Sequence, residues 1–322
     1  MKRKVLKLIL VILRFFIAIG APLTFLAALW LKLVRKTGTG KISDNILMQV
    51  GIWPLMDHYY EPMINPKKHL LKPLRDDRPL HGIDLNVKEQ LSLLSEFHYN
   101  EELLRFPLDK TGNIEYHYNN VSYGSGDSEY LYSMIRHFKP GRIIEIGSGH
   151  STLMARNAIA ANQLQAPGYA CRHICIEPYE QPFLEKTGVE VRREKVEQVD
   201  KALFQTLERN DILFIDSSHI IRPQGDVLFE YLELLPTLKP GVLVHVHDIF
   251  TPKDYPDEWI HEHTLWNEQY LLEAFLVFNS GFKIVGALNY LIHHHRNEFA
   301  AKCPVFASQQ KKQPGAFWMV KN

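Results

Sequence analysis

The stretch RIIEIGSGHSTLMA, residues 142–155, decides the fold class of this chain. It opens with a short run rich in isoleucine, continues with Gly147 and Gly149 separated by one residue, and ends with apolar residues at helical spacing. This pattern predicts a buried strand, a tight turn and a helix. Because glycine has no Cβ atom and tolerates positive φ, the turn would let the backbone come close to a ligand.

Strands and helices alternate along the chain after Pro140. Apolar strands are expected at 142–146, 172–176, 189–191, 211–215 and 242–247, and the spacing predicts helices at 151–161, 199–207 and 226–238. This order predicts parallel βαβ units and therefore an α/β fold with helices on both faces of the sheet. A ligand of such a sheet binds at the carboxyl ends of the strands, near the point where the strand order reverses.

The two glycines do not fit either of the common phosphate-binding loops. A dinucleotide fingerprint would need a third glycine where Thr152 stands, and no Gly-Lys-Ser or Gly-Lys-Thr follows the turn. A second acid, Glu177, ends the next apolar strand, where a carboxylate can accept the hydroxyls of a ribose. The pattern therefore predicts a nucleoside ligand without a pyrophosphate, and it excludes a dehydrogenase.

In these motifs the chain resembles the class I S-adenosylmethionine-dependent methyltransferases. The segment EIGSGHST, residues 145–152, is similar to their first motif, and Glu177 is similar to their ribose-binding acid. The resemblance implies a Rossmann-like doubly wound sheet, mostly parallel with an antiparallel last strand, and S-adenosylmethionine as cofactor. In this chain the cofactor-binding residues that it implies are Glu145, which would set the loop, Gly147, Ser148, Gly149, Ser151, Glu177 and Asp216.

Further motifs resemble a branch of small-molecule methyltransferases related to macrolide sugar and cephalosporin-tailoring enzymes. These motifs are ILFIDSSH at 212–219 and VHVHD at 244–248, and the likeness extends over about 127–250 plus a final strand at 316–320. The segments 82–86 and 126–129 resemble bacterial membrane-associated members of the superfamily. The resemblance implies a small-molecule or sugar acceptor.

Candidate catalytic residues stand at the ends of the fourth and fifth strands. Asp216 ends the fourth strand and His247-Asp248 ends the fifth, so these side chains are expected to open onto one crevice. Methyl transfer to a hydroxyl requires removal of its proton. His219 is a candidate general base because its ordinary pKa is about 6.5, with Asp216 and His247 as the other candidates. The alternative for His219 is a helix cap.

The same crevice is a candidate metal site. In related metal-dependent members, acids at these positions hold a magnesium ion, which would lower the pKa of a bound hydroxyl. The candidate ligands here are Asp216, His247 and Asp248. Because His247 stands where many members have a second acid, another divalent metal, such as manganese, iron or zinc, is an alternative to magnesium. The alternative for Asp248 is an Asx turn that leads into Thr251.

The first 36 residues differ from the rest of the chain. Residues 8–31 are apolar apart from Arg14, and basic residues flank them on both sides. The apolar length suffices for a spanning helix of about 20 residues. The symmetric basic flanks and Pro22 equally favour a hairpin that is bent at Pro22 and enters one leaflet. Both forms predict a membrane anchor that binds lipid through residues 1–36. The catalytic domain is expected to face the cytoplasm, where the cofactor is found. This orientation favours the hairpin, because a single span with its N-terminus inside would export the domain.

Composition limits the remaining possibilities. A net charge of +1 gives no support for nucleic-acid binding, and three cysteines among 322 residues argue against a disulfide framework. We expect an anchor at 1–36, a helical or irregular lead-in or cap at 37–125, and a methyltransferase domain at 126–322. A lid-like aromatic insertion is expected at about 251–268, followed by a helix whose polar first residues, 266–270, are placed to face the crevice.

The sequence therefore predicts a membrane-associated methyltransferase. Its acceptor would be a hydroxyl of a small molecule, a sugar or a lipid-linked glycan, with a metal ion as a possible aid to the reaction. A membrane scaffold that keeps the nucleoside pocket without catalysis is the alternative. The presence of Asp216, His219 and Asp248 around one crevice argues against the scaffold, although the fold alone would not. Oligomeric state is not readable from the sequence.

Overall fold

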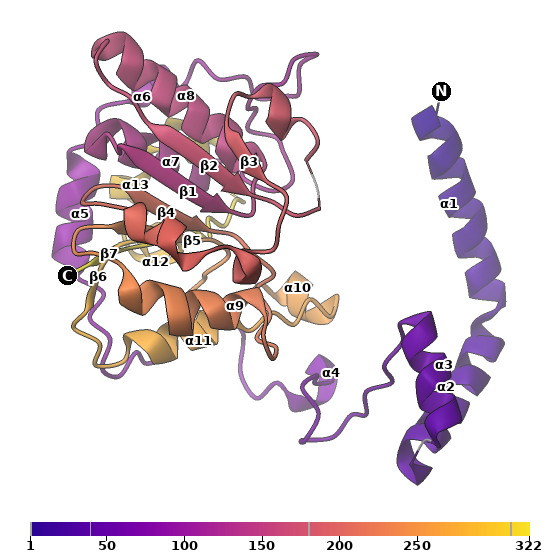
Figure 1. Cartoon of the computed structure of the whole chain (residues 1–322). Helices are drawn as coiled ribbons and strands as arrows, with labels where there is room; N and C mark the ends of the chain where they lie inside the picture. Colours follow the sequence, from indigo (N-terminus) through magenta and orange to yellow (C-terminus); the bar gives the residue numbers. More distant parts are fainter. Residues whose placement is uncertain (1, 39, 180, 310) are drawn as a thin grey trace. The chain divides into compact units, whose positions relative to one another are not determined.

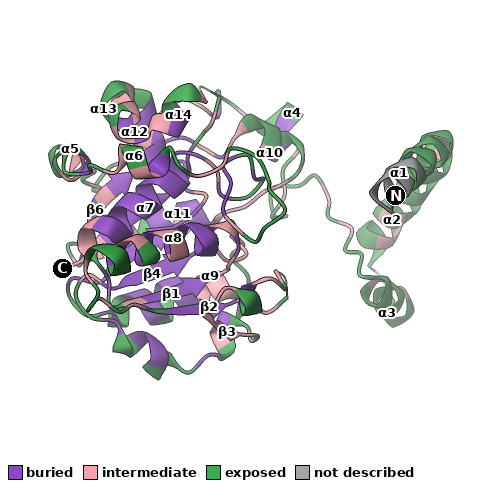
Figure 2. Ribbon diagram, turned by 90° about the horizontal axis from the view of Figure 1, so that it is seen from above, coloured by how far each residue is buried: buried purple, intermediate pink, exposed green. Residues whose placement is uncertain are grey.

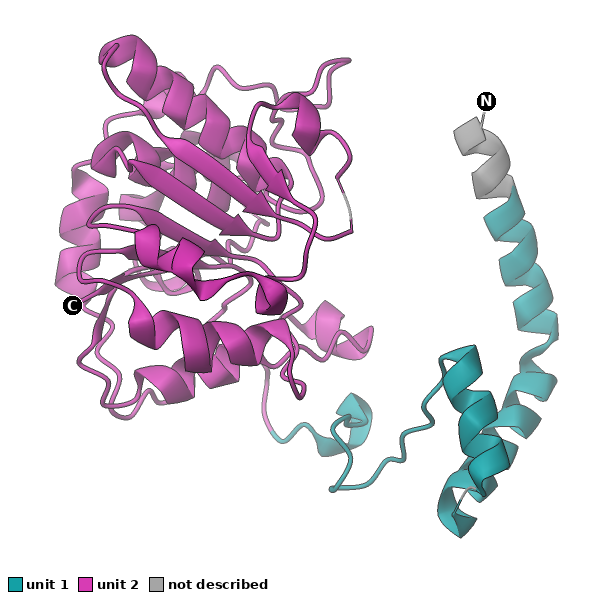
Figure 3. Ribbon diagram, viewed as in Figure 1, with its two compact units in different colours: residues 1–71 teal, residues 72–322 magenta. Residues whose placement is uncertain are grey.

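The computed structural model of the chain describes residues 2–38, 40–179, 181–309 and 311–322. The chain divides into two compact units, Met1–Leu71 and Lys72–Asn322 (Figure 3). The division falls inside the segment that was expected to form the lead-in or cap. Residues 72–125 therefore belong to the same unit as the predicted methyltransferase domain.

The first unit is helical, with α1 (Lys2–Ile19), α2 (Ala21–Thr37), α3 (Lys41–Val50) and α4 (Pro66–His69). Among the described residues, no single helix is long and apolar enough to cross a membrane, whereas the pair Ile9–Ile19 and Ala21–Thr37, bent by 65°, passes that test of length and composition. The break lies at Gly20 rather than at Pro22, because proline fits the first turn of α2, where its missing N–H is not needed.

The second unit is built on a seven-stranded sheet (Figure 1). Its strands are β1 (Arg142–Ile146), β2 (Arg172–Ile176), β3 (Glu190–Arg192), β4 (Ile212–Ile215), β5 (Leu243–Val246), β6 (Phe282–Ala287) and β7 (Phe317–Lys321). The strand order is β3-β2-β1-β4-β5-β7-β6, with β1 to β5 parallel and β7 antiparallel to both of its neighbours. This confirms the predicted doubly wound sheet and its antiparallel last strand. The order reverses between β1 and β4, so both strands end at the expected binding crevice.

Helices cover both faces of this sheet. They are α5 (Val87–Ser95), α6 (Asn100–Leu103), α7 (Asp127–Phe138), α8 (His150–Gln165), α9 (Asp226–Leu228), α10 (Asp257–His261), α11 (Glu268–Leu276), α12 (Leu288–His294), α13 (Arg296–Lys302) and α14 (Pro304–Ser308). The 3₁₀ helices are η1 (Leu184–Lys186), η2 (Val196–Gln198), η3 (Lys201–Thr206) and η5 (Leu235–Thr237), and η4 (Phe229–Leu234) is a π-helix. The helix predicted at 226–238 therefore consists of three consecutive helical types.

Two buried apolar clusters lie on opposite faces of the sheet. Ile143 of β1 packs with α7 and α8 in one cluster, and Ile144 and Ile146 pack with η4 and α11 in the other. The central strands β1, β4 and β5 and helix α7 are largely buried, whereas α2, α3 and the described part of α1 are largely exposed (Figure 2). The alternation along β1 places Glu145 on the α7 and α8 side of the sheet.

Candidate active site

The turn after β1 needs glycine at its first position. Gly147 has φ +74°, and a Cβ atom built on it would lie 1.8 Å from the backbone oxygen of Asp216. Gly149 has φ 177°, an extended conformation that any residue adopts, and the nearest atom to its built Cβ is 3.8 Å away on Gln181. Gly147 therefore serves the close approach of β1 and β4, whereas a Cβ atom on Gly149 would make only ordinary contact with Gln181.

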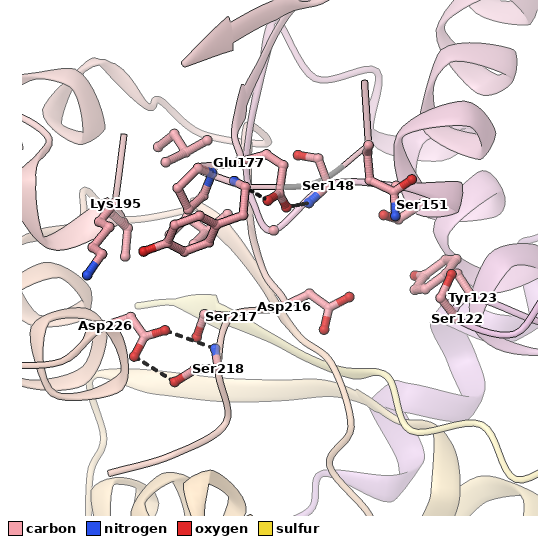
Figure 4. Close-up of a pocket in the computed structure, with 18 of the residues that line it drawn as sticks. Ser122, Tyr123, Ser148, Ser151, Glu177, Lys195, Asp216, Ser217, Ser218 and Asp226 are labelled. Atoms are coloured by element: carbon pink, nitrogen blue, oxygen red, sulfur yellow. Dashed lines mark hydrogen bonds between the residues drawn. The ribbon is translucent and has the colours of Figure 1, made fainter. Parts of the chain in front are cut away.

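A cavity of about 400 Å³ opens beside this turn (Figure 4). Its lining includes most of the residues predicted to bind the cofactor: Gly147, Ser148, Gly149, Ser151, Glu177 and Asp216. Glu177 follows β2 and accepts a hydrogen bond from the Ser148 amide at 3.2 Å, so the acid and the glycine turn are joined. The structure thus brings residues from three strand ends into one pocket.

Glu145 is the predicted cofactor-binding residue that does not line the cavity. Its carboxylate lies on the buried side of the turn and accepts hydrogen bonds from Ser151 and Thr152 at 2.6 and 2.9 Å. This geometry agrees with a role in setting the loop, and it gives Glu145 no direct access to the pocket.

Several lining residues were not predicted. Ser122 and Tyr123 come from the segment before α7, Lys195 and Val196 follow β3, and Ser217, Ser218, Arg222 and Asp226 follow β4. The last two groups could have been found, because they lie after strand ends. Ser122 and Tyr123 could not, because their segment carries neither strand nor helix periodicity.

The predicted catalytic and metal-binding side chains converge next to this pocket. His219 Nε2 lies 3.2 Å from Asp216 Oδ1 and 3.6 Å from Asp248 Oδ2. His247 Nδ1 lies 3.4 Å from Asp216 Oδ1 and 3.5 Å from Asp248 Oδ2. Strand pairing explains this convergence, since Ile215 of β4 pairs with Val246 of β5. We call Asp216, His219, His247 and Asp248 the acid–histidine cluster.

A further buried acid orients His219. Glu268, the first residue of α11, is fully buried and lies 2.8 Å from His219 Nδ1 through its Oε2. Its Oε1 accepts a hydrogen bond from Tyr231 at 3.1 Å. The Trp266 ring lies over His219, with 4.3 Å between the ring centres. Of the polar residues at the start of this helix, which were expected to face the crevice, Glu268 contacts His219, and none of residues 266–270 lines the cavity.

Burial and charge act in opposite directions on this cluster. Burial disfavours the charged imidazole of His219, but Asp216 and Glu268 prevail and raise its pKa well above the ordinary value. Burial likewise opposes charge on His247, while Asp248 and Asp216 raise its pKa. Burial raises the pKa of Asp248, and both histidines hold the pKa of Asp216 below its ordinary value despite burial. Metal-free, the cluster favours imidazolium rings beside an ionised Asp216.

The donor atoms of the cluster fit a divalent cation. Asp216, His219 and Asp248 each offer one ligand atom within 4.8 Å of the others. The described residues supply no hydrogen bond to either ring nitrogen of the buried His247. A set of two carboxylates and imidazole nitrogen suits manganese, iron or zinc better than an all-oxygen site would. His219 thus joins Asp216 and Asp248 as a candidate ligand, with His247 beside them.

Comparison with known proteins gives matches of three kinds. Residues 144–249 match the sequence model of a family described as "Methyltransferase domain". A protein of Archaeoglobus fulgidus named "Uncharacterized protein" is 31% identical over 167 residues, which are 48% of this chain and 74% of that protein.

Two solved structures are also similar to this chain. One is the O-methyltransferase from Bacillus cereus in complex with SAH, with 13% identity, a TM-score of 0.37, and coverage of 72% of this chain and 91% of that one. The other is the N-terminal domain of EvdMO1 in the presence of SAH and D-fucose, with 14% identity, a TM-score of 0.35, and coverage of 74% and 97%.

Proposed function

We propose that this chain, which belongs to the class I S-adenosylmethionine-dependent methyltransferases, methylates a hydroxyl oxygen of a small-molecule, sugar or lipid-linked glycan acceptor. The observation that carries this proposal is the position of Asp216, which lines the cavity and also lies 3.2 Å from His219. A hydroxyl nucleophile must lose its proton as the methyl group is transferred. A histidine surrounded by carboxylates, 3.2 Å from an acid that lines the cavity, is suited to take that proton.

The pocket fits the cofactor by its shape and its polar groups. Gly147 and Gly149 allow the backbone to approach a ligand, and Glu177 stands where a ribose would be held. Ser148 Oγ is buried and has no hydrogen-bond partner among the described residues. When bound, the cofactor supplies a methyl group on a sulfonium, and the chain's own residues orient the two reactants.

His219 is the base that the geometry favours in a metal-free reaction. Glu268 holds Nδ1 at 2.8 Å, so Nε2 faces Asp216 and Asp248. Because the neighbouring carboxylates raise the pKa of His219, its base form is populated at alkaline pH or when another cation enters the cluster. Asp216 and Asp248 would then stabilise the positive charge that forms on His219.

A metal-assisted reaction uses the same residues differently. A divalent cation held by Asp216, His219 and Asp248, or with His247 in place of His219, would lower the pKa of the acceptor hydroxyl. In that form His219 is a ligand and Glu268 fixes its ring, as carboxylates commonly do for metal-bound histidines. The two forms differ in their response to added metal.

Calorimetric titration of the whole chain tests the pocket first. We expect S-adenosylmethionine and S-adenosylhomocysteine to bind with micromolar affinity and NAD not to bind. Repetition with magnesium and with manganese, for the native chain and Asp248→Asn, tests the cluster. A heat of metal binding that disappears in the variant supports metal assistance. If a folded chain binds neither cofactor form, the methyltransferase proposal fails and the scaffold alternative gains support.

We further propose that residues 1–36 attach the enzyme to a membrane with the catalytic unit in the cytoplasm. The support is the bent pair Ile9–Ile19 and Ala21–Thr37, whose apolar side chains are exposed along both helices. The basic residues Arg35 and Lys36 in the last turn of α2 would lie beside anionic headgroups. Flotation with vesicles of anionic and of neutral phospholipid tests this, and failure to float with either would contradict it.

A further inference from the structure

A second polar cluster lies on the buried side of the glycine turn, and the proposed reaction does not use it. Glu145 of β1 and His173 of β2 have 2% and 1% of their side chains exposed. Glu145 Oε2 lies 2.8 Å from His173 Nε2. In the parallel pairing of β1 and β2, Ile143 is opposite His173 and Glu145 is opposite Cys175. Side chains two residues apart share one face of a strand, so all three polar groups face the α8 layer.

Hydrogen bonds tie this carboxylate to the cofactor loop. A buried carboxylate is costly unless it is well hydrogen-bonded. Oε1 of Glu145 accepts from Ser151 at 2.6 Å, and Oε2 accepts from Thr152 at 2.9 Å in addition to His173. Cys175 adds a weaker thiol contact at 3.5 Å. Ser151 and Thr152 lie in the first turn of α8, directly after Gly149.

The chemistry of these groups gives the hydrogen bonds a direction. An ionised carboxylate only accepts hydrogen bonds, so Thr152 donates its single hydroxyl proton to Glu145. The Thr152 oxygen then accepts the backbone N–H of Gly149 at 3.1 Å. Gly149 lines the cavity. A continuous chain therefore runs from the pocket wall through Thr152 and Glu145 to His173 on the neighbouring strand.

The second ring nitrogen of His173 indicates which tautomer is present. The described residues give Nδ1 no hydrogen-bond partner. A ring with its proton on Nε2 donates to Glu145 and leaves no buried N–H without an acceptor. We propose that His173 is a positioning residue for cofactor binding, which holds the Glu145 carboxylate so that Thr152 fixes the Gly149 amide at the pocket.

Two substitutions at position 173 separate the hydrogen bond from packing. His173→Leu removes the donor and keeps an apolar side chain, whereas His173→Gln keeps an N–H donor near the position of Nε2. The measurement is the Kd of S-adenosylhomocysteine for the whole chain by calorimetry. We expect the leucine variant to raise Kd about tenfold, which corresponds to about 1.4 kcal/mol. We expect the glutamine variant to restore most of the affinity.

The matched control lies on the other face of the same strand. Ile174 packs in the opposite apolar cluster, and Ile174→Val removes one buried methyl group without changing the Glu145 hydrogen bonds. We expect this variant to bind the ligand as the native chain does. Equal weakening in the leucine and glutamine variants, or weakening in Ile174→Val, would overturn the proposal, because packing would then explain the effect.

Metal content is the second measurement. Ligand atoms of Glu145, His173 and Cys175 lie within 4.8 Å of one another. A metal-free native chain together with rescue by glutamine supports the positioning role. One equivalent of metal that is lost in both variants at position 173 would overturn it and assign these residues to a metal site. Because ligand binding is measured and no acceptor is needed, failure of this proposal is distinguishable from failure of the O-methylation proposal.

Discussion

At the scale of single residues, the two glycines of the turn have different roles. Gly147 is required by the fold, since its φ is +74° and the backbone of Asp216 occupies the space beside it. Gly149 is extended and has room for a Cβ atom. The backbone geometry of β1 and β4 therefore explains Gly147, whereas no close contact with a neighbouring residue requires glycine at position 149.

Substitution of the two glycines should separate stability from binding. Gly147→Ala forces a positive φ on alanine, which alone costs about 1–3 kcal/mol, and adds a clash with Asp216. We expect a lower Tm. Gly149→Arg should keep the native Tm and abolish S-adenosylhomocysteine binding, because its side chain enters the pocket. Thermal melts and calorimetry check both variants, and unchanged binding by Gly149→Arg would contradict the pocket assignment.

The raised pKa of His219 in the acid–histidine cluster predicts how the stability of the fold depends on pH. Because Glu268 helps to raise the pKa of His219, Glu268→Gln should lower that pKa. In the folded chain the pKa of His219 lies above its unfolded value of about 6.5. The His219–Glu268 pair therefore contributes its full stabilisation of the fold below about pH 6.5. The stabilisation is lost as pH rises through the folded pKa.

NMR titration of the imidazole signals in chelator-treated chain measures this shift. We expect His219 to titrate at lower pH in Glu268→Gln than in the native chain. Glu233→Gln is the matched control, because Glu233 is an exposed acid paired with Lys201. If the His219 titration does not move in Glu268→Gln, or moves equally in Glu233→Gln, then Glu268 is not a cause of the raised pKa of His219.

At this scale the sequence predicted the acids and histidines because they stand at strand ends. It could not find Glu268 or His173 as their partners. Glu268 reaches His219 across 49 positions of the chain, and His173 looks like an ordinary residue of an apolar strand. Contacts between distant segments depend on register and helix docking, which a single sequence does not reveal.

At the scale of elements, the segment before α5 fastens the lid-like insertion. Arg78 makes ion pairs with Glu273 of α11 and with Asp254, the latter at 3.0 Å. Lys253 pairs with Asp77 and donates to the Arg75 carbonyl oxygen at 2.8 Å. We call residues 74–80 the strap. It holds the start of the insertion that follows β5.

Loss of the central arginine should loosen the lid without disturbing the sheet. Arg78→Met keeps the aliphatic stem but leaves the partly buried Glu273 without its cation, which we expect to cost about 1–3 kcal/mol. Hydrogen exchange should then become faster at 251–256 and stay unchanged in β1. Lys201→Met, which breaks an exposed pair worth at most about 1 kcal/mol, is the control. Equal exchange in native and Arg78→Met chains would contradict a fastening role.

Periodicity explains which elements could be predicted. The strands β1, β2, β4 and β5 are continuous apolar runs between clear turns, and all were placed within a residue or two. β6, whose sequence is FKIVGA, was not predicted. Its burial alternates along the strand, so it is not a continuous apolar run like the other four. The strap has no period, since Pro73 precedes it and Pro79 interrupts it. Its structure comes from ion pairs with distant residues rather than from local preference.

At the scale of the whole molecule, the two units divide the proposed roles. The residues that line the cavity lie between Ser122 and Asp226, inside the unit Lys72–Asn322. The lead-in predicted at 37–125 contains two different parts. Leu94, Phe97 and Leu103 are buried in the cluster that packs on α7 and α8, whereas residues before 72 belong to the first unit. These three apolar residues therefore pack the segment that contains α5 and α6 into the core of the second unit.

Truncation at two nearby positions tests this division. The fragment 72–322 keeps the strap and the whole cavity. We therefore expect it to fold and to bind S-adenosylhomocysteine with the Kd of the whole chain, without floating with anionic vesicles.

The fragment 81–322 lacks the strap, including Arg78 and its pairs with Glu273 and Asp254. We expect a lower Tm and faster exchange at 251–256, while the ligand still binds. If 72–322 folds but binds at least tenfold more weakly than the whole chain, the first unit contributes to the site. Equal Tm values for the two fragments would instead show that the strap does not stabilise the catalytic unit.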